Sequence, residues 1–169
     1  ECTNVLADYL IRRMPAAKKS AKNIYGCRGI WFPLADDVWG QCTPESTYYG
    51  VWIGAAPWIE QHLWWHYLYT GDKEFLKNTA YRFFREVAAF YEDYLCEDEE
   101  GELQIMPSQS PENRFREHER EICGEIDGAM DFRVSICKSS AMDIELANDA
   151  LYYAIRSAEI LRLDPERIV

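Results

Sequence analysis

Hydrophobic residues recur at the spacing of a helix in five segments of the chain. In each segment, apolar residues return every three or four positions, which places them on one face of a helix. The segments are 2–13, 15–25, 57–69, 72–95 and 144–161. A short strand is expected only at 103–106, after an acidic turn at 97–101 that we expect to be solvated. The pattern predicts an all-α fold with long irregular loops and a short β-hairpin.

Residues at the ends of these segments predict where the helices start and stop. Pro15 suits the first turn of a helix, so the first two segments are expected to be separate helices, the second ended by Gly26. Gly71 follows the third helix, and Asp72 can cap the fourth. The third and fourth helices are therefore expected to form an antiparallel hairpin across a short turn.

The third helix is apolar on more than one face. Trp58, Trp65 and Leu68 lie outside the stripe that contains Ile59 and Leu63. A helix that is apolar all round is usually buried, so we expect this one to lie inside the fold.

Two long stretches, 26–50 and 107–140, lack helical periodicity and are rich in turn-forming residues. Loops of this length inside a domain usually carry function. Helical hairpins joined by long loops at one end predict a toroid of paired helices. Asp164 followed by Pro165 is a helix-start signal close to Val169. We therefore expect residues 1–169 to be one fragment of a helical barrel whose native chain extends in both directions.

Charge and hydropathy narrow the partners. The chain has 29 Asp and Glu against 18 Lys and Arg, a net charge of -11. This balance repels phosphate backbones, so nucleic acid is a poor partner. Neither an apolar run long enough for a membrane span nor a secretory leader is seen. Six Trp, eleven Tyr and seven Phe suit a core first, but flat rings also suit sugars.

The six cysteines do not follow the spacing of a zinc site. Their even count is compatible with disulfides, but the helical pattern does not resemble a small disulfide-stapled scaffold. We expect mostly free, buried thiols. The sequence does not assign a compartment.

The sharpest local feature is the segment 107–113, which reads Pro-Ser-Gln-Ser-Pro-Glu-Asn. Two prolines, Pro107 and Pro111, stiffen the backbone around one acid, Glu112. A carboxyl held at the mouth of a cavity can act as a general acid. The alternative is a capped turn in which Glu112 faces water, and the residues alone favour that alternative.

A second candidate is the pair Asp36 and Asp37 beside Trp39. The carboxylates could bind sugar hydroxyls while the indole stacks on the sugar ring. The alternative is an Asx turn with Trp39 as a buried anchor. The residues alone favour neither interpretation.

The remaining candidates favour structural roles. His62 and His66 lie one helical turn apart without the glutamate of a zinc-protease motif, which favours core histidines over a metal site. Asp143 is better explained as a helix cap, and Cys137 has no His/Asn partners for nucleophilic work. Asp127 and Asp131 lie in the second loop, and no role is assigned to them.

Five motifs in order along the chain carry a family resemblance. They are Tyr25-Gly26-Cys27-Arg28-Gly29, Asp37-Val38-Trp39-Gly40, the run 61–76 from Gln61-His62-Leu63 to Phe75-Leu76, the segment 107–113, and Ala141-Met142-Asp143-Ile144. Together they resemble glycoside hydrolase family 95, the inverting alpha-L-fucosidases and their alpha-L-galactosidase relatives.

The resemblance implies a six-hairpin (α/α)6 barrel, of which this chain holds roughly half the helices. It implies that Glu112 is the general acid, and it assigns Asp37, Trp39 and Asn113 to sugar binding. It also implies a carbohydrate substrate and no metal or cofactor. In an inverting hydrolase a second carboxylate activates water on the opposite face of the sugar, about 6.5–9.5 Å from the acid.

The sequence departs from the family pattern in ways that bear on activity. Where the family tends to carry a His-His-Asn-Thr-Asp-like run, residues 32–37 read Phe-Pro-Leu-Ala-Asp-Asp, which leaves the sugar open. The family's Asn-x-Asn pair belongs before Glu1 and its catalytic base after Val169. We therefore expect this chain alone to be inactive, and its uncovered helical faces to favour self-association.

Two alternatives stay open at this point. One is a noncatalytic carbohydrate-binding or scaffold domain with the same helical architecture. The other is a different six-hairpin glycosidase or phosphorylase that acts on another sugar. The position of Glu112, inward beside a cavity or outward in solvent, distinguishes an enzyme from a scaffold.

Overall fold

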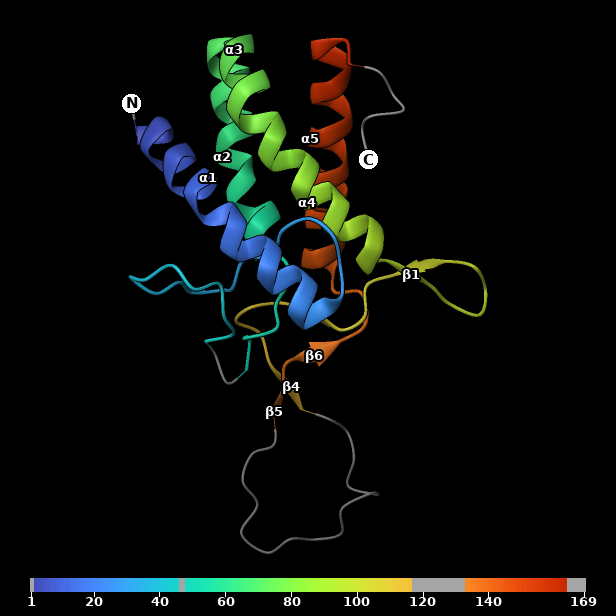
Figure 1. Cartoon of the computed structure of the whole chain (residues 1–169). Coiled ribbons are helices and arrows are strands. Elements are labelled where there is room, and N and C mark those ends of the chain that lie inside the picture. The colour runs from blue at the N-terminus through green and yellow to red at the C-terminus, as the bar shows by residue number, and fades with distance from the viewer. Residues whose placement is uncertain (1, 46–47, 117–132, 164–169) are drawn as a thin grey trace, which may run out of the picture.

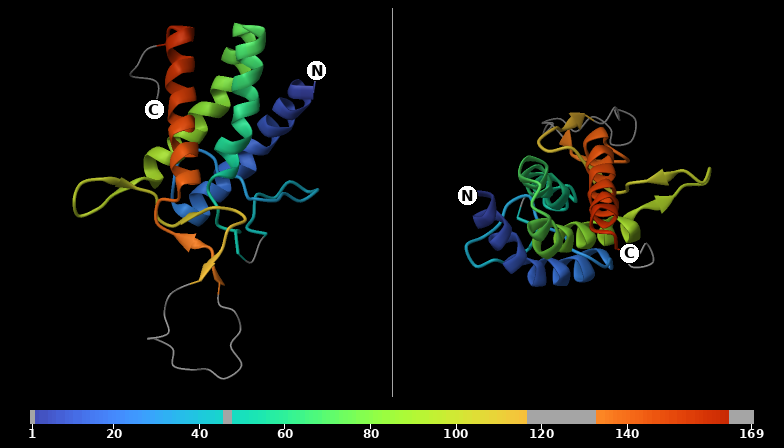
Figure 2. Two further views of the ribbon diagram at one scale, coloured as in Figure 1. Left: turned by 180° about the vertical axis from the view of Figure 1, so that it is seen from behind. Right: turned by 90° about the horizontal axis from the view of Figure 1, so that it is seen from above.

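The computed structural model describes residues 2–45, 48–116 and 133–163. Its helices run alternately toward and away from one end of the molecule, and the long irregular connections gather at that end (Figure 1). The view from behind shows the same arrangement (Figure 2, left). The helical elements are α1 (Cys2–Ser20), η1 (Ala21–Tyr25), α2 (Ala55–Thr70), α3 (Lys73–Phe75), η2 (Leu76–Ala80), α4 (Tyr81–Tyr94) and α5 (Ala141–Leu161). The predicted helical character is confirmed.

The hairpin between the third and fourth predicted helices is confirmed. Gly71 adopts the left-handed conformation, with φ of 64°, and its N–H donates to the carbonyl of Tyr67 at 2.7 Å. The side chain of Asp72 then accepts the N–H of Phe75 at 2.9 Å and caps the next helix. From there α3, the π-helical η2 and α4 follow one another directly.

The first two predicted helices are one helix, so the predicted break at Pro15 is wrong. Pro15 lies inside α1, and the helix continues through the π-helical turn η1 to Gly26. Proline removes one backbone donor and crowds the preceding turn, which costs about 3 kcal/mol inside a helix. The buried face nevertheless runs unbroken through Leu10, Met14 and Ala17, and its packing offsets that cost. The regular spacing of apolar residues on that face indicates one continuous helix, and it is a better guide here than the proline.

Helix α2 is buried on only one face, so the expectation that it lies inside the fold is wrong for the residues that the structure describes. Leu63 and Trp64 are buried, as is Glu60. Trp58 and Trp65 are 53% and 46% exposed. The apolar residues of this helix therefore lie partly in the core and partly on the surface.

The core extends over all the long helices, and the packing of α4 against α5 is a large part of it. Helix α4 buries Phe83, Phe84, Val87 and Tyr91 on one face. The facing side of α5 is rich in alanine, and small side chains let two helix backbones approach closely. The buried alanines of α5 are Ala147, Ala150, Ala154 and Ala158. This packing fixes the ends of both helices and with them the loops that hold the candidate site.

Three short antiparallel strand pairs follow α4 among the described residues, one before the second long loop and two within it. β1 (Cys96–Glu97) pairs with β2 (Leu103–Gln104), which confirms the predicted short strand and hairpin. β3 (Ser108–Gln109) pairs with β6 (Ile136–Cys137), and β4 (Phe115–Arg116) pairs with β5 (Arg133–Val134). The two ends of the loop are therefore held together where it leaves and rejoins the helices.

Hydrogen bonds of two aromatic side chains tie the beginning of the first long connection to its end, just before α2. The indole N–H of Trp31 donates to the carbonyl of Trp52 at 2.9 Å, and the Tyr25 hydroxyl donates to the carbonyl of Val51 at 2.8 Å. Trp31 is fully buried. At Gly29, where φ is 68°, the chain runs so close to α4 that an added Cβ would lie 2.0 Å from the carbonyl oxygen of Glu86.

The thiols are partly as expected. Cys27 and Cys42 are free and buried, whereas Cys96 is free and exposed and Cys137 is free and half-buried. The side chains of Cys2 and Cys123 lie outside the described residues, as do the helix predicted to start at Asp164 and the loop residues Asp127 and Asp131. Among the described helices, none has the length and apolar character that crossing a membrane requires.

Glu60 is an unusual member of the core. It lies in α2 with none of its surface exposed, and neither carboxylate oxygen has a hydrogen-bond partner among the described residues. Burial raises the pKa of Glu60 well above its usual value, and the nearby Asp149 raises it further. The side chain is therefore expected to be protonated, because a neutral carboxyl costs far less to bury than a carboxylate.

Replacing Gly29 with alanine is expected to destabilise the fold strongly. Gly26→Ala is the matched control, because Gly26 also has a positive φ of 73° but has no atom within 4 Å of the added Cβ. The control should lose about 1–2 kcal/mol from the left-handed backbone alone. Gly29→Ala adds the collision with α4 and should lose about 2–5 kcal/mol in all. Equal losses in urea unfolding would show that the close approach is absent.

Glu60→Gln is expected to remove a pH dependence of stability. Because the folded protein holds the Glu60 proton more tightly than the unfolded chain does, the free energy of unfolding should fall as pH rises above the unfolded pKa. The slope from one such group is at most about 1.4 kcal/mol per pH unit. Glu60→Gln should flatten it, whereas the exposed Glu99→Gln should not. Parallel curves for the two variants in denaturant titrations from pH 4 to 8 would contradict the buried neutral acid.

Candidate active site

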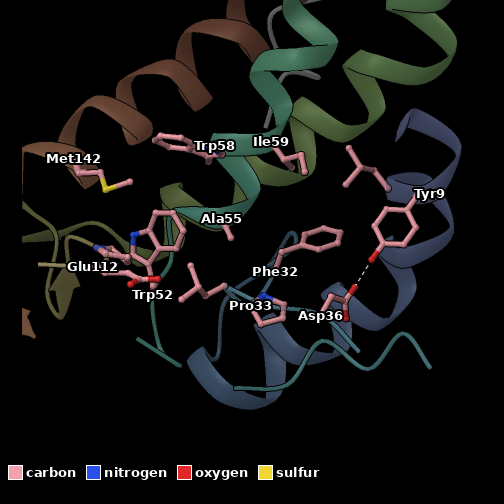
Figure 3. A pocket seen from close by; sticks show the side chains of 13 residues that line it. Tyr9, Phe32, Pro33, Asp36, Trp52, Ala55, Trp58, Ile59, Glu112 and Met142 are labelled. Atoms are coloured by element: carbon pink, nitrogen blue, oxygen red, sulfur yellow. Dashed lines mark hydrogen bonds between the residues drawn. The ribbon is translucent and has the colours of Figure 1, made fainter. Parts of the chain in front are cut away.

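A cavity of about 440 Å³ opens between the N-terminal halves of α1 and α2 and the loops at that end (Figure 3). Pockets of this size commonly hold small-molecule ligands. Its lining comes from both helices, both long loops and the start of α5. The lining residues are Tyr9, Leu10, Phe32, Pro33, Leu34, Asp36, Trp52, Ala55, Trp58, Ile59, Pro111, Glu112 and Met142.

The walls of the cavity are mostly apolar and aromatic, with two acidic side chains among them. Phe32, Trp52 and Trp58 present rings, and Asp36 and Glu112 come from different loops (Figure 3). A ring face that covers C–H groups while a few polar atoms bind hydroxyls is a surface suited to a sugar.

Glu112 lies at the open rim of this cavity, beside Trp52 (Figure 3). Its residue surface is exposed, so it is both accessible to solvent and part of the cavity wall. The turn that holds it is closed by the N–H of Asn113, which donates to the carbonyl of Ser110 at 2.7 Å. The Asn113 side chain also donates to the Ser110 hydroxyl, at 3.1 Å. The acid is thus presented by an ordered turn.

Asp36 and Asp37 have different surroundings although they are neighbours. Asp36 lines the cavity and accepts hydrogen bonds from the Tyr9 hydroxyl, at 2.6 Å, and from the guanidinium of Arg13. Its hydrogen bond and negative charge, together with burial, raise the pKa of the Tyr9 hydroxyl. Asp36 is therefore held in one position at the wall.

Asp37 turns into its own loop. One carboxylate oxygen accepts the N–H groups of Trp39, Gly40 and Gln41 at 2.9, 2.5 and 3.1 Å. These bonds, that of Gln41 foremost, hold the pKa of Asp37 below its usual value. The Asx turn considered from the sequence is confirmed, but the idea of Trp39 as a buried anchor is wrong, because its side chain is 83% exposed.

Of the four site residues that the resemblance implies, the structure brings the assigned acid, Glu112, into the cavity lining and none of the three assigned to sugar binding. Asp37, Trp39 and Asn113 lie on the same loops but outside that lining. Asn113 is exposed, and its carbonyl accepts the hydroxyl of Tyr49 at 3.3 Å. All three stand next to segments that do line the cavity.

Sequence reasoning missed the aromatic walls. Trp52 lies between two loop motifs, and the sequence pattern around Trp58 indicates only an apolar helix face. Both line the cavity. Pro57, at the start of a helix that follows a long loop, could have indicated that Trp58 stands at the loop end of the barrel.

Asp143 is more than a helix cap. The cap of α5 is the Ser140 hydroxyl, which accepts the N–H of Asp143 at 3.2 Å. The Asp143 carboxylate itself is fully buried and accepts from Trp52 Nε1 at 2.8 Å, Ser108 Oγ at 2.7 Å and Gln109 N–H at 3.0 Å. Burial raises the pKa of Asp143, and these hydrogen bonds oppose the shift.

The two histidines contact aromatic rings instead of each other. His62 is exposed and packs edge-on against Trp65, with ring centroids 5.3 Å apart. His66 is half-buried and packs against Phe75 at 4.3 Å. They are surface histidines more than core histidines. Within the described residues, no three His, Cys, Asp or Glu side chains are grouped to hold a metal.

A comparison with sequence families gives the class of protein, the catalytic domains of glycoside hydrolases. The sequence model described as the glycosyl hydrolase family 95 catalytic domain matches residues 1–168. The chain belongs to this family. Its catalytic domain is a six-hairpin helical barrel, so the predicted fold class is confirmed.

Three curated proteins are also similar in sequence to this chain. The chain is 30% identical over 163 residues to alpha-L-fucosidase 2 of Arabidopsis thaliana. This alignment covers 95% of this chain and 18% of that protein. It is 30% identical over 114 residues to a kojibiose hydrolase of Flavobacterium johnsoniae, covering 62% and 16% respectively. It is 25% identical over 119 residues to a probable alpha-fucosidase A of Aspergillus niger, covering 67% and 15%. The chain therefore spans less than a fifth of the length of each relative.

Proposed function

We propose that the protein in which these residues occur is an inverting glycoside hydrolase that removes terminal alpha-L-fucose, or the related alpha-L-galactose, from a carbohydrate. Glu112 is the general acid that protonates the glycosidic oxygen. The observation that carries the proposal is the presentation of this carboxyl at the rim of an aromatic-walled cavity by an ordered turn.

The chemistry needs a proton donor in contact with the leaving-group oxygen. A terminal sugar seated in the cavity would place its glycosidic bond at the opening, where Glu112 lies. Such a donor contributes about 10²–10⁴-fold to the rate. The similarity to two fucosidases by name supports the choice of sugar.

The base that activates water is proposed to lie outside these 169 residues. Asp36 is the other acid in the lining, but its carboxylate is already occupied by Tyr9, Arg13 and the N–H of Asp37. Because these donors already use its oxygens, the Asp36 carboxylate is better suited to holding the cavity wall in place than to acting as the base that takes a proton from water. The chain alone is therefore expected to bind sugar without hydrolysing it.

The residues outside the lining have a place in this proposal. Trp39 offers an exposed indole three residues beyond Asp36, where it can contact the part of a carbohydrate that projects from the cavity. Asp37 shapes the loop that carries Trp39 and is proposed to bind sugar hydroxyls with its remaining oxygen. Asn113 is proposed to contact the sugar next to the acid.

A second sugar class follows from a specific similarity. The kojibiose hydrolase matches this chain over 114 residues. Kojibiose is therefore the alternative substrate, and it should be assayed beside the fucoside and the galactoside.

Glu112→Gln in the protein that naturally contains this chain is expected to lose activity according to the leaving group. With a sugar leaving group, which needs protonation, kcat should fall about 10²–10⁴-fold. With 2,4-dinitrophenyl alpha-L-fucoside, which leaves without protonation, the loss should be much smaller. Glu99→Gln, at an exposed position of the β1–β2 hairpin, is the matched control and should retain full activity. Unchanged turnover of the disaccharide by Glu112→Gln would rule out the assigned acid.

The first sugar released should have the inverted anomeric configuration, which proton NMR detects before mutarotation. Retention of configuration would contradict the inverting mechanism. Turnover of kojibiose with no turnover of either L-sugar would replace the proposed substrate while leaving Glu112 as the acid.

Trp58→Ala is expected to weaken binding of free L-fucose about tenfold, equal to about 1.4 kcal/mol, because Trp58 is part of the cavity wall. Trp39→Ala should leave monosaccharide binding unchanged and weaken a longer fucosylated oligosaccharide. Isothermal titration calorimetry separates the two effects. Equal losses for the monosaccharide would show that both rings contact one sugar.

A further inference from the structure

Asp143 binds three segments of the site with one carboxylate. The side chain lies in the first turn of α5 and has no exposed surface. Its Oδ1 accepts the indole N–H of Trp52, and its Oδ2 accepts the Ser108 hydroxyl and the Gln109 N–H. These donors are 91, 35 and 34 residues away in sequence.

Each donor belongs to a part of the cavity. Trp52 is a wall of the cavity. Ser108 and Gln109 form β3, which leads directly into the turn that presents Glu112. Met142, the residue before Asp143, also lines the cavity. The carboxylate therefore connects the aromatic wall to the support of the acid.

Capping alone does not explain this residue. Ser140 already caps α5, so the helix does not need an acid in its first turn for that purpose. Among the described residues no Lys, Arg or His forms an ion pair with Asp143, although burying a charge without a counter-ion is costly. The helix N-terminus and the three donors compensate that cost, and they do so only in this arrangement.

Neighbouring hydrogen bonds make the arrangement rigid. The Gln109 side chain is buried and donates to the carbonyl of Tyr48 at 2.6 Å. The Ser140 N–H donates to Ser108 Oγ at 2.9 Å, and the Ser140 hydroxyl donates to the carbonyl of Gln109 at the same distance. These bonds fix the register of β3, the strand that leads to Glu112, against the start of α5.

We propose that Asp143 is a positioning residue of the glycosidase site, which holds Trp52 and the Glu112 turn at a fixed separation. The inference rests on the proposed function of Glu112. Asp143 does not touch the substrate in this proposal. Asp143 acts by fixing the position of Glu112 relative to Trp52, which is part of the sugar-binding wall.

Asp143→Asn in the full protein tests the proposal. The amide has the same shape, but its NH₂ group must face either the Trp52 N–H or the two donors on β3, and two donors repel each other. A displacement of about 1 Å can cost about 10²-fold in rate. We expect kcat on a fucosyl disaccharide to fall about 10–100-fold, with a loss of less than about threefold on 2,4-dinitrophenyl alpha-L-fucoside, because only the first substrate needs a well-placed acid.

Two further variants keep the test decisive if Asp143→Asn does not fold. Trp52→Phe removes only the donor to Oδ1, and Ser108→Ala removes one donor to Oδ2. Each should show a smaller loss in the same direction, larger for the disaccharide than for the activated substrate. Asp143→Glu should not restore the rate, because its longer side chain cannot satisfy both sides at once.

The outcomes separate this inference from the proposed function. Equal losses on both substrates, or no loss, would overturn the positioning role, since a merely structural effect lowers the amount of folded enzyme for every substrate. Glu112→Gln is assayed in parallel. If that variant shows no dependence on the leaving group, the assigned acid is wrong and the positioning role falls with it. If Glu112→Gln shows the dependence and none of the variants at Asp143, Trp52 and Ser108 does, only the positioning role is wrong.

Discussion

A single buried carboxylate, that of Asp143, accepts hydrogen bonds from both long connections at one end of this molecule. Irregular loops cannot build a core of their own, because their backbone groups need partners and their side chains do not repeat on one face. Here the first turn of a core helix supplies the partner, and Trp52 and β3 are fixed to it. The packing of α4 on α5 determines where that turn lies. This side chain is thus one link between core and cavity, beside the hydrogen bonds of Ser140 to Ser108 and Gln109.

The helices provide the precision that the site needs. Alanines on α5 let it lie close to the large aromatic residues of α4, so the helix ends have little freedom. The first loop is joined to this scaffold by the backbone N–H of Trp31, which donates to the carbonyl of Ala17 in α1, and by the close approach at Gly29. A site built from loops becomes well defined when each loop is fastened near its functional residue.

The sequence predicted what depends on local physics. The stripe of α4, the cap at Asp72 and the left-handed Gly71 all follow from spacing and backbone geometry, and all are confirmed. The break at Pro15 was wrong because burial of a continuous face outweighed the cost of the proline. The burial of α2 was wrong because periodicity reports which faces are apolar and not which of them find a partner.

The candidate site was predicted only in part, for a similar reason. Glu112 could be named because prolines and a family motif mark its turn, and it does line the cavity. Trp52 and Trp58 carry no local mark, and only the packing of distant segments makes them walls. Asp143 resembled a cap because its long-range partners are invisible along the chain.

The distribution of indole rings has a practical consequence. Trp31, Trp52 and Trp64 are buried, whereas Trp39, Trp58 and Trp65 are exposed. The tryptophan fluorescence should thus have two components. The buried indoles should emit at shorter wavelength and be shielded from iodide, whereas the exposed indoles should emit at longer wavelength and be quenched by iodide. Since Trp58 belongs to the second group and also borders the cavity, a ligand that covers it would shield that ring, and the molecule carries its own optical reporter of occupancy without any added dye.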